Sequence, residues 1–303
     1  MGLPAAGLPP AERAVDGLVQ VLLDATVNHG GPVDGDRLKG WHAALFPTGY
    51  SGLRRILVGD WRPASSDPMQ VVSGPVGREK VHFEAPPAGR VELEMGRLFA
   101  WWRASDSRLD GLIRAALAHL WFVTIHPFDD GNGRIARAIA DMALAQDEQT
   151  GRRLYSMSGQ IARERDDYYD SLQRAQRGSG DVTEWVGWFL GCLERAILCS
   201  EEQVSIALLK ARFWQKCGEV SLNERQRKVL NRLLDAGPGG FEGGLSTRKY
   251  RGLTMTSQAT AKRDMGELIA KDILKRNPGG GRSASYDLIW PETDSSKLKN
   301  GRS

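Results

Sequence analysis

Apolar residues recur at helical spacing through the first two thirds of the chain. One stretch, residues 109–125, is apolar around nearly its whole circumference, which is typical of a buried central helix. The last helical stretch is long enough for its helix to be kinked or broken. The predicted helices are, in chain order, 11–28, 36–46, 92–104, 109–125, 134–146, 161–176 and 182–216.

Two segments interrupt this helical pattern. Residues 48–68 are rich in Gly, Ser and Pro and predict an irregular connection. Residues 69–83 hold two short runs of β-type residues, MQVVSG and KVHF, on either side of a Gly/Pro turn. This arrangement predicts a β-hairpin. The first part of the chain is therefore expected to be an all-α core with one small hairpin.

The pattern changes again after residue 218. A helix capped by Asn223 is predicted through residue 236, then a short helix at 245–250 and a longer one at 257–271. Two short strands, 273–276 and 284–289, flank a Gly-rich turn. This is the element order of a winged helix-turn-helix. We expect a first domain at 1–218, a winged helix-turn-helix domain at 219–292 and a disordered tail at 293–303.

The composition is that of an ordinary globular protein, with 41% hydrophobic and 26% charged residues among 303. Collagen, coiled coil and wholesale disorder are excluded. The longest apolar stretch, 115–128, is too short and too polar to span a bilayer, and the N-terminus does not resemble a signal peptide. The three cysteines have no CxxC spacing, which favours reduced thiols and a cytoplasmic location.

Charge is distributed unevenly along the chain. Residues 1–220 carry 25 Lys and Arg against 28 Asp and Glu, whereas residues 221–303 carry 16 against 9. A basic C-terminal part suits DNA or a dimer contact, and a solvated basic surface would look the same. Both uses of a winged helix, DNA binding and protein contact, stay open. The polar and basic residues predicted for its recognition helix and wing are Ser257, Gln258, Thr260, Lys262, Arg263, Arg276 and Arg282.

The segment most informative about chemistry is residues 126–137, HPFDDGNGRIAR, which joins the buried helix to the next one. Its Gly-Asn-Gly sequence, just before a helix start, can turn several N–H groups toward one anion. Arg134 and Arg137 are three residues apart and can project from one side of the first helical turn. Asp130 can hold Mg²⁺ that bridges phosphates, and His126 suits a general base. The combination predicts a nucleotide-transfer site.

Simpler interpretations exist for each of these residues taken alone. A Gly-rich turn with a single His is usually only a turn. Asp130 could cap the following helix, and Arg137 could pair with Asp141 four residues later. The presence of all these residue types together, in this order within residues 126–137, favours a nucleotide-transfer site instead.

The segment resembles the signature of the Fic family, HxFx(D/E)GNGRxxR, at every specified position. The resemblance extends over about residues 11–216, because MQVVSG resembles the flap of that family and the stretch after residue 168 resembles its later core. It implies a protein adenylyltransferase, which moves AMP from ATP to a hydroxyl side chain of a target protein and releases pyrophosphate. Gly133 is intact, which favours AMP transfer over the phosphate transfer of a related toxin branch.

The resemblance also implies a role for each motif residue. His126 would deprotonate the target Ser, Thr or Tyr hydroxyl, and Asp130 would hold Mg²⁺. Phe128 would anchor the loop in the core, and Asp129 has no implied role. The phosphates of ATP would be held by the N–H groups of Gly131, Asn132 and Gly133, by the Asn132 side chain, and by Arg134 and Arg137.

Two further groups are implied more weakly. Val72, Ser73 and Gly74 of the hairpin would face the site and dock the target backbone, unless the hairpin has no such role. Tyr168, Tyr169 and Gln176 would lie on the adenine side, or would belong to a Tyr-rich packing surface. His119, on the buried helix, is expected to be a core residue.

Family members with an inhibitory helix carry the pattern [S/T]xxxE[G/N], in which the Glu pairs with the second motif arginine. No Glu in this chain has Ser or Thr four residues before it. We therefore expect no self-inhibition within the chain, with self-modification an open outcome. The alternative function is a DNA-binding regulator whose Fic core senses nucleotide, but an intact His126 favours the enzyme.

Overall fold

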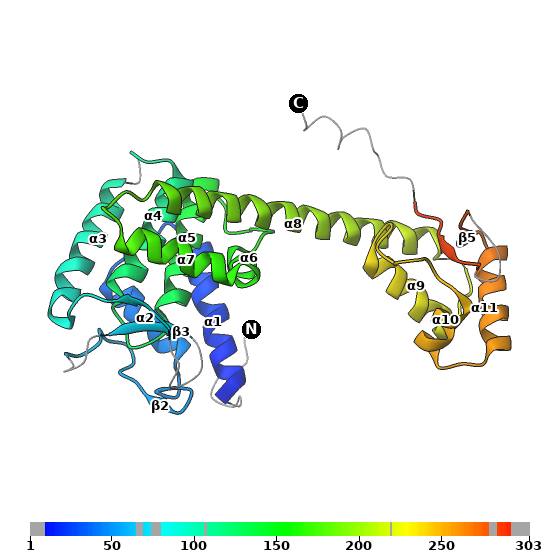
Figure 1. The fold of residues 1–303 in the computed structure, drawn as a ribbon, viewed down its shortest axis with the longest axis horizontal. Coiled ribbons are helices and arrows are strands. Elements are labelled where there is room, and N and C mark those ends of the chain that lie inside the picture. Colours follow the sequence, from blue (N-terminus) through cyan, green and yellow to red (C-terminus); the bar gives the residue numbers. More distant parts are fainter. Residues whose placement is uncertain are drawn as a thin grey trace. The chain divides into compact units, whose positions relative to one another are not determined.

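A computed structural model describes residues 10–64, 69–73, 80–105, 108–218, 220–278 and 284–291. The chain divides into two compact units, Met1–Cys199 and Ser200–Ser303. The boundary falls inside one long helix, α8 (Thr183–Lys216), drawn in green in Figure 1. Within the described ranges, no helix is long and apolar enough to cross a membrane.

The first unit is a helical core built around α4 and α5, which make the most extensive pairing of elements in the chain. Both helices are buried along most of their length, and α5 is rich in alanines that allow close packing. The helices are α1 (Pro10–Val27), α2 (Gly35–Leu45), α3 (Val91–Ser105), α4 (Gly111–Ile125), α5 (Asn132–Glu148), α6 (Met157–Arg163), α7 (Arg165–Arg177) and the start of α8, with a short 3₁₀ turn at Ala88–Arg90.

Two hairpins accompany this core. Strand β3 (Gln70–Ser73) pairs antiparallel with β4 (Lys80–Glu84), which confirms the predicted hairpin. Val72 and Ser73 lie in β3, opposite Val81 and Lys80, whereas Gly74 lies outside the described residues. A second, very short hairpin, β1 (Tyr50–Ser51) with β2 (Arg54–Arg55), lies in the segment that was predicted to be an irregular connection.

Three helix predictions need correction. The predicted helix 161–176 is two helices, because the chain leaves helical geometry at Glu164, whose carboxylate forms an ion pair with Arg195 at 2.6 Å. Helix α8 is a single helix of 34 residues and is not broken into two elements. Helix α5 begins at Asn132, two residues before its predicted start.

The second unit contains α9 (Glu224–Ala236), α10 (Thr247–Thr254), α11 (Gln258–Ala270) and a hairpin of β5 (Leu274–Arg276) with β6 (Tyr286–Leu288). The order is the one that the sequence predicted. The short helix starts later than expected, because Leu245 pairs with Tyr286 in a β-bridge and Ser246 caps α10. Arg282 and the tail 293–303 lie outside the described residues.

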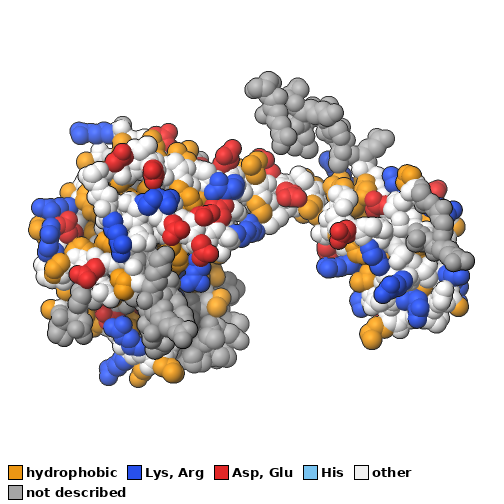
Figure 2. Space-filling model, in the orientation of Figure 1, with side chains coloured by type: hydrophobic (Ala, Val, Ile, Leu, Met, Phe, Trp, Pro, Cys, Tyr) orange, Lys and Arg blue, Asp and Glu red, His pale blue; other side chains and the backbone are white. Residues whose placement is uncertain are grey.

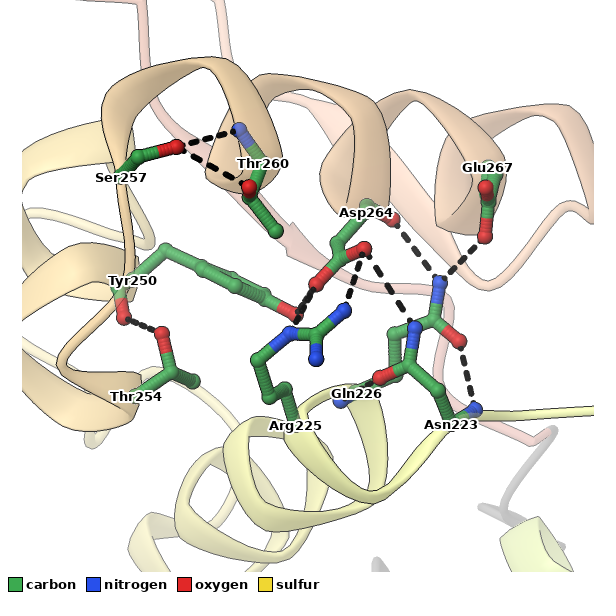
Figure 3. Close-up of polar contacts among 9 residues, drawn as sticks. All are labelled: Asn223, Arg225, Gln226, Tyr250, Thr254, Ser257, Thr260, Asp264 and Glu267. Carbon is green, nitrogen blue, oxygen red and sulfur yellow. Dashed lines mark hydrogen bonds and ion pairs between the residues drawn. The ribbon is translucent and has the colours of Figure 1, made fainter.

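A buried carboxylate, Asp264, ties α9, α10 and α11 together (Figure 3). It accepts hydrogen bonds from the Tyr250 hydroxyl at 3.0 Å and from Arg225 Nε at 2.8 Å, with a longer contact from Asn223 at 3.4 Å. Gln226 closes a capping box with Asn223 and also donates to the backbone oxygen of Asp264. The network fixes α11 on α9 and α10.

Candidate active site

The loop between α4 and α5 has two residues in left-handed backbone geometry. Helix α4 ends at His126 with φ 51°, and α5 starts after Gly131 with φ 80°. A Cβ at Gly131 would also lie 2.8 Å from the ring of Phe46, so both conformation and space require glycine there. Because the first N–H groups of a helix have no intrahelical acceptor, the start of α5 presents donors toward the loop.

Asn132 holds this loop closed. Its side-chain oxygen accepts from the Phe128 N–H at 3.0 Å, and its side-chain nitrogen donates to the Phe128 oxygen at 2.8 Å. The residue is 2% exposed. The Asn132 side chain was expected to hold phosphate oxygens, but here both of its polar groups bond the loop itself. Phe128 is fully buried and stacks on His42 at 4.2 Å between ring centroids, as expected of a core anchor.

His126 is held from both sides. Its ring Nδ1 lies 3.2 Å from the Val123 oxygen, and its own backbone oxygen accepts from Arg62 Nε at 2.8 Å. Burial, aided by the Arg62 charge, lowers the pKa of His126 to about 4, although the Val123 contact and Asp130 oppose the shift. The ring is therefore neutral near pH 7. With Nδ1–H donating to Val123, the lone pair of Nε2 is left as a proton acceptor.

Both motif carboxylates are bound by groups of the chain. Asp130 accepts from the Ser51 hydroxyl and from the Gly131 N–H, and Asp129 accepts from the Leu57 N–H at 3.1 Å. Gly131 is the N-cap of α5 and no side chain caps it, so the alternative role of Asp130 as a helix cap is wrong.

Neither carboxylate belongs to a cluster of three or more His, Cys, Asp or Glu, as far as the described residues go. Mg²⁺ is commonly held by one or two carboxylates together with substrate phosphates, and a carboxylate has about four lone-pair sites. The Asp130 carboxylate, the predicted ligand, is therefore chemically suited to Mg²⁺ of this kind.

The two motif arginines differ in their surroundings. The Arg134 guanidinium lies over the Phe46 ring at 4.6 Å, and burial lowers its pKa. Arg137 makes no hydrogen bond or ion pair with any residue that the structure describes, and its Nη1 lies 3.4 Å from the position of a Cβ at Gly133. Arg137 was considered as a partner of Asp141, but Asp141 pairs with Arg153 at 2.9 Å.

A pocket of about 330 Å³ brings the motif together with the hairpin and α7. Predicted site residues that line it are His126, Asp130, Asn132, Gly133, Arg137, Tyr168, Tyr169 and Gln176. Gly131 and Arg134 are not part of its lining. The hairpin contributes Met69, Gln70 and Phe83. Sequence reasoning also missed Arg54, which lines the pocket, and Ser51 and Arg62, which hold the motif, because all three come from the segment 48–68.

On the α7 side of the pocket, Tyr168 is almost fully buried, and its hydroxyl lies 3.0 Å from His119 Nε2. Burial raises the pKa of Tyr168 and lowers that of His119 to about 3. His119 is fully buried, which confirms its place in the core. Gln176 donates to the Thr124 hydroxyl at 3.1 Å. Tyr168 thus serves packing and pocket lining together.

Comparison with known proteins gives a consistent result for the motif region. Residues 32–144 match the model of the Fic/DOC family. The chain is 35% identical over 113 residues to the protein adenylyltransferase Fic of Culex quinquefasciatus, covering 37% of this chain and 21% of that protein. It is 34% identical over 121 residues to the protein of the same name from Nematostella vectensis, covering 39% and 26%. The chain thus matches only about a quarter of the length of these relatives.

A similar solved structure is that of a Fic family protein from Desulfovibrio desulfuricans G20. It is 20% identical and has a TM-score of 0.48, with 95% of this chain and 78% of that chain covered.

Proposed function

We propose that this chain, whose residues 32–144 match the model of the Fic/DOC family, transfers AMP from ATP to a hydroxyl side chain of a target protein. The observation that carries the proposal is the pocket, which His126 at the end of α4, Asp130 of the loop and Arg137 of α5 line together with Tyr168, Tyr169 and Gln176 of α7. The histidine is neutral near pH 7, and Arg137 has no ion pair with any described residue. The relatives named protein adenylyltransferase support the same reaction.

In the proposed reaction, His126 takes the proton of a Ser, Thr or Tyr hydroxyl of the target. The hydroxyl oxygen attacks the α-phosphorus of ATP and forms the new phosphorus–oxygen bond. The bond between the α-phosphorus and the bridging oxygen breaks, and pyrophosphate leaves with that electron pair. A His126 ring that is neutral at pH 7 can accept this proton in nearly every molecule.

The remaining motif residues would position ATP and balance its charge. The N–H groups of Asn132 and Gly133 would bind phosphate oxygens at the start of α5, with Arg134 and Arg137 adding positive charge. The Gly131 N–H was expected to do the same, but it donates to the Asp130 carboxylate. Tyr168, Tyr169 and Gln176, on the far side of the pocket, would contact adenine. Asn132 would contribute through its backbone, since its side chain is bonded to Phe128.

Asp130, with Asp129 beside it, would hold Mg²⁺. Mg²⁺ bound there would neutralise phosphate charge, which is the main requirement of transfer at phosphorus. The hairpin would dock the target. In the described part of the chain, β3 pairs only with β4, so the other edge of β3, around Val72 and Ser73, can accept an added strand from the target.

The proposal is tested by incubating the full chain and Mg²⁺ with ATP labelled on the α-phosphate or on the γ-phosphate. The incubations are run with and without a cell lysate. We expect protein to be labelled only from the α-position. Label from the γ-position would indicate phosphate transfer, and no label in any arm would contradict the enzyme. Dependence on ATP and three cysteines without CxxC spacing favour the cytoplasm as the location.

For the second unit we propose contact with duplex DNA through α11. Lys262 and Arg263 are exposed on α11 and form no ion pair with any residue in the described ranges. Figure 2 shows Lys and Arg side chains gathered over the end of the unit where α10 and the start of α11 lie. Ser257 caps α11, so this basic face coincides with a positive helix end.

A gel shift with the full chain at two salt concentrations tests the DNA proposal. We expect weak binding that falls steeply as salt rises and that Lys262→Ala with Arg263→Ala removes. Absence of binding at low salt would leave a protein or dimer contact. If the chain binds DNA and ATP but transfers no AMP, the alternative of a nucleotide-sensing regulator is favoured.

A further inference from the structure

Arg153 and Asp141 form a buried ion pair on the side of α5 away from its start. Arg153 Nη1 lies 2.9 Å from an Asp141 carboxylate oxygen and also donates to the Asp141 backbone oxygen at 2.8 Å. The side chains are 5% and 13% exposed. The Arg153 guanidinium also lies 4.4 Å over the Tyr155 ring, and Glu148 is 3.9 Å away. The pair is therefore shielded from water, and charge interactions are stronger in such a buried position than in water.

Asp141 lies four residues after Arg137 on the same helix. Side chains at this spacing are neighbours on a helix surface, and an Arg and an Asp there form an ion pair when nothing prevents it. In this chain they do not pair. The Arg137 guanidinium lies over the preceding turn, near Gly133, and lines the pocket. The Asp141 carboxylate is bound by Arg153 instead.

The charges around Asp141 indicate how its carboxylate would be neutralised or paired if Arg153 were absent. Burial raises the pKa of Asp141, and Arg153 and then Arg137 oppose that rise, whereas Glu148 adds to it. Arg137 is thus the next positive charge that the carboxylate interacts with. If Arg153 were removed, the buried carboxylate would have to take a proton or attract Arg137 along the helix, away from the pocket.

We propose that Arg153 is a positioning residue that occupies Asp141 and so keeps Arg137 available to the phosphates of ATP. The inference rests on the proposed function, because it needs Arg137 to bind a phosphate. Arg153 is not among the residues that line the pocket of about 330 Å³, so it would act through Asp141 and Arg137.

The test measures ATP affinity of the full chain by calorimetry. Arg153→Met removes the charge at similar volume, and we expect it to raise the Kd of ATP by about tenfold or more, because a charge-assisted contact is lost. Adding Asp141→Asn to Arg153→Met should restore the affinity to within about twofold of the wild type, since the competing carboxylate is gone. Arg152→Ala, the exposed neighbour, is the matched control and should change nothing.

A merely structural role would give a different result. The melting temperature would fall with Arg153→Met, and ATP affinity would follow stability and not be restored by Asp141→Asn. Unchanged affinity in folded Arg153→Met, or a double variant as weak as the single one, would overturn the inference.

Arg153→Lys keeps the charge but loses the forked contact, and it provides the same comparison if Arg153→Met does not fold. We expect a smaller rise in Kd that Asp141→Asn again reverses. No rise, or a rise that Asp141→Asn leaves in place, would overturn the inference.

If the chain transfers AMP, the Arg153 variants should change the KM for ATP more than kcat. A wild-type chain that binds ATP but labels no protein would contradict the proposed function while leaving this comparison intact. A wild-type chain that binds no ATP would overturn both.

Discussion

The polar groups around Asp264 and those of the motif differ in how they are bonded. Around Asp264, in the second unit, the Tyr250 hydroxyl, Arg225 and Gln226 all bond to the same residue (Figure 3). In the first unit, Arg137 reaches into a pocket without a hydrogen bond or ion pair to any other described residue. Among the described residues, the His126 ring has one hydrogen-bond partner, the Val123 backbone oxygen at 3.2 Å.

The first arrangement is typical of groups that stabilise a fold, and the second is typical of groups in a binding or catalytic site. A buried polar group without a partner costs free energy, so a folded chain normally satisfies it. Asp264 and its partners follow that rule and fix three helices. The motif is held by other contacts, those of Asn132 and Arg62, which leaves His126 and Arg137 open toward the pocket. Open groups on a rigid support are what catalysis requires.

The largest expected effect comes from removing the base. His126→Ala should lower AMP transfer by about 10²–10⁴-fold, because proton transfer from the target hydroxyl is lost. ATP affinity should stay near that of the wild type, since no phosphate contact is assigned to His126. Initial rates with α-labelled ATP and calorimetry of ATP measure the two quantities. A variant that transfers AMP at the wild-type rate would contradict the assigned role.

The paired cluster should respond in stability and not in catalysis. Asp264→Ala leaves a buried Tyr250 hydroxyl and Arg225 without their acceptor, and we expect the second unit to lose about 2–3 kcal/mol of unfolding free energy. Asp235→Asn, which breaks the exposed pair with Lys210, is the matched control and should cost less than about 1 kcal/mol. Urea unfolding followed by a probe in the second unit measures both, and equal losses would refute the comparison.

The same network has a defined pH dependence. Burial alone would raise the pKa of Asp264, but hydrogen bonds from Arg225 and Tyr250 and the Arg225 charge outweigh it, and the pKa lies below its usual value. Its stabilising contribution is therefore present above about pH 4 and is lost as the pH falls through the folded-state pKa. The difference in free energy of unfolding between wild type and Asp264→Ala should therefore become smaller as the pH falls below about 4, which urea unfolding at several pH values measures.

The proposed metal-binding role of Asp130 predicts a smaller change. Asp130→Ala should remove most of the gain in ATP affinity that Mg²⁺ gives, since Asp130 is the proposed ligand. Calorimetric titration of ATP with and without Mg²⁺ measures this gain. Ser51→Ala, which removes only the hydroxyl that bonds Asp130, is the control and should keep most of it. A gain as large in Asp130→Ala as in the wild type would assign the metal to another residue.

The pH profile of transfer should show the smallest change. Because burial lowers the pKa of His126 to about 4, the base stays unprotonated and kcat/KM should be nearly constant from about pH 5.5 to 8. An ordinary histidine would lose half of the rate near pH 6.5. Rates measured across this range decide between the two, and half-maximal activity near pH 6.5 would show that the pKa of His126 is not lowered.

The motif could be found in the sequence because its residues are contiguous and joined to two helices with clear apolar periodicity. The residues from other segments that contact the motif or line its pocket could not be found in this way. Ser51, Arg54 and Arg62 come from an irregular segment without a periodic pattern, and only the fold brings them to the loop. The partner of Asp141 was equally hidden, because spacing allows a pair with Arg137 and gives no sign of Arg153.

The break at Glu164 and the unbroken α8 were missed for a related reason. Apolar periodicity indicates which face of a helix is buried, but it does not reveal whether helical geometry is interrupted. At Glu164 the backbone leaves the helix while the carboxylate pairs with Arg195, which lies 31 residues later in α8. Such long-range contacts are absent from any local pattern.

The central claim is that Arg137 is available to bind a phosphate of ATP. The direction in which Arg137→Ala changes the rate of transfer tests it most directly. Transfer from α-labelled ATP is measured for the full wild-type chain and for Arg137→Ala. We predict an active wild type without any activating change and a lower rate in Arg137→Ala, because a charge-assisted phosphate contact is lost. An inactive wild type that Arg137→Ala switches on would show that a carboxylate occupies Arg137, and would contradict the claim.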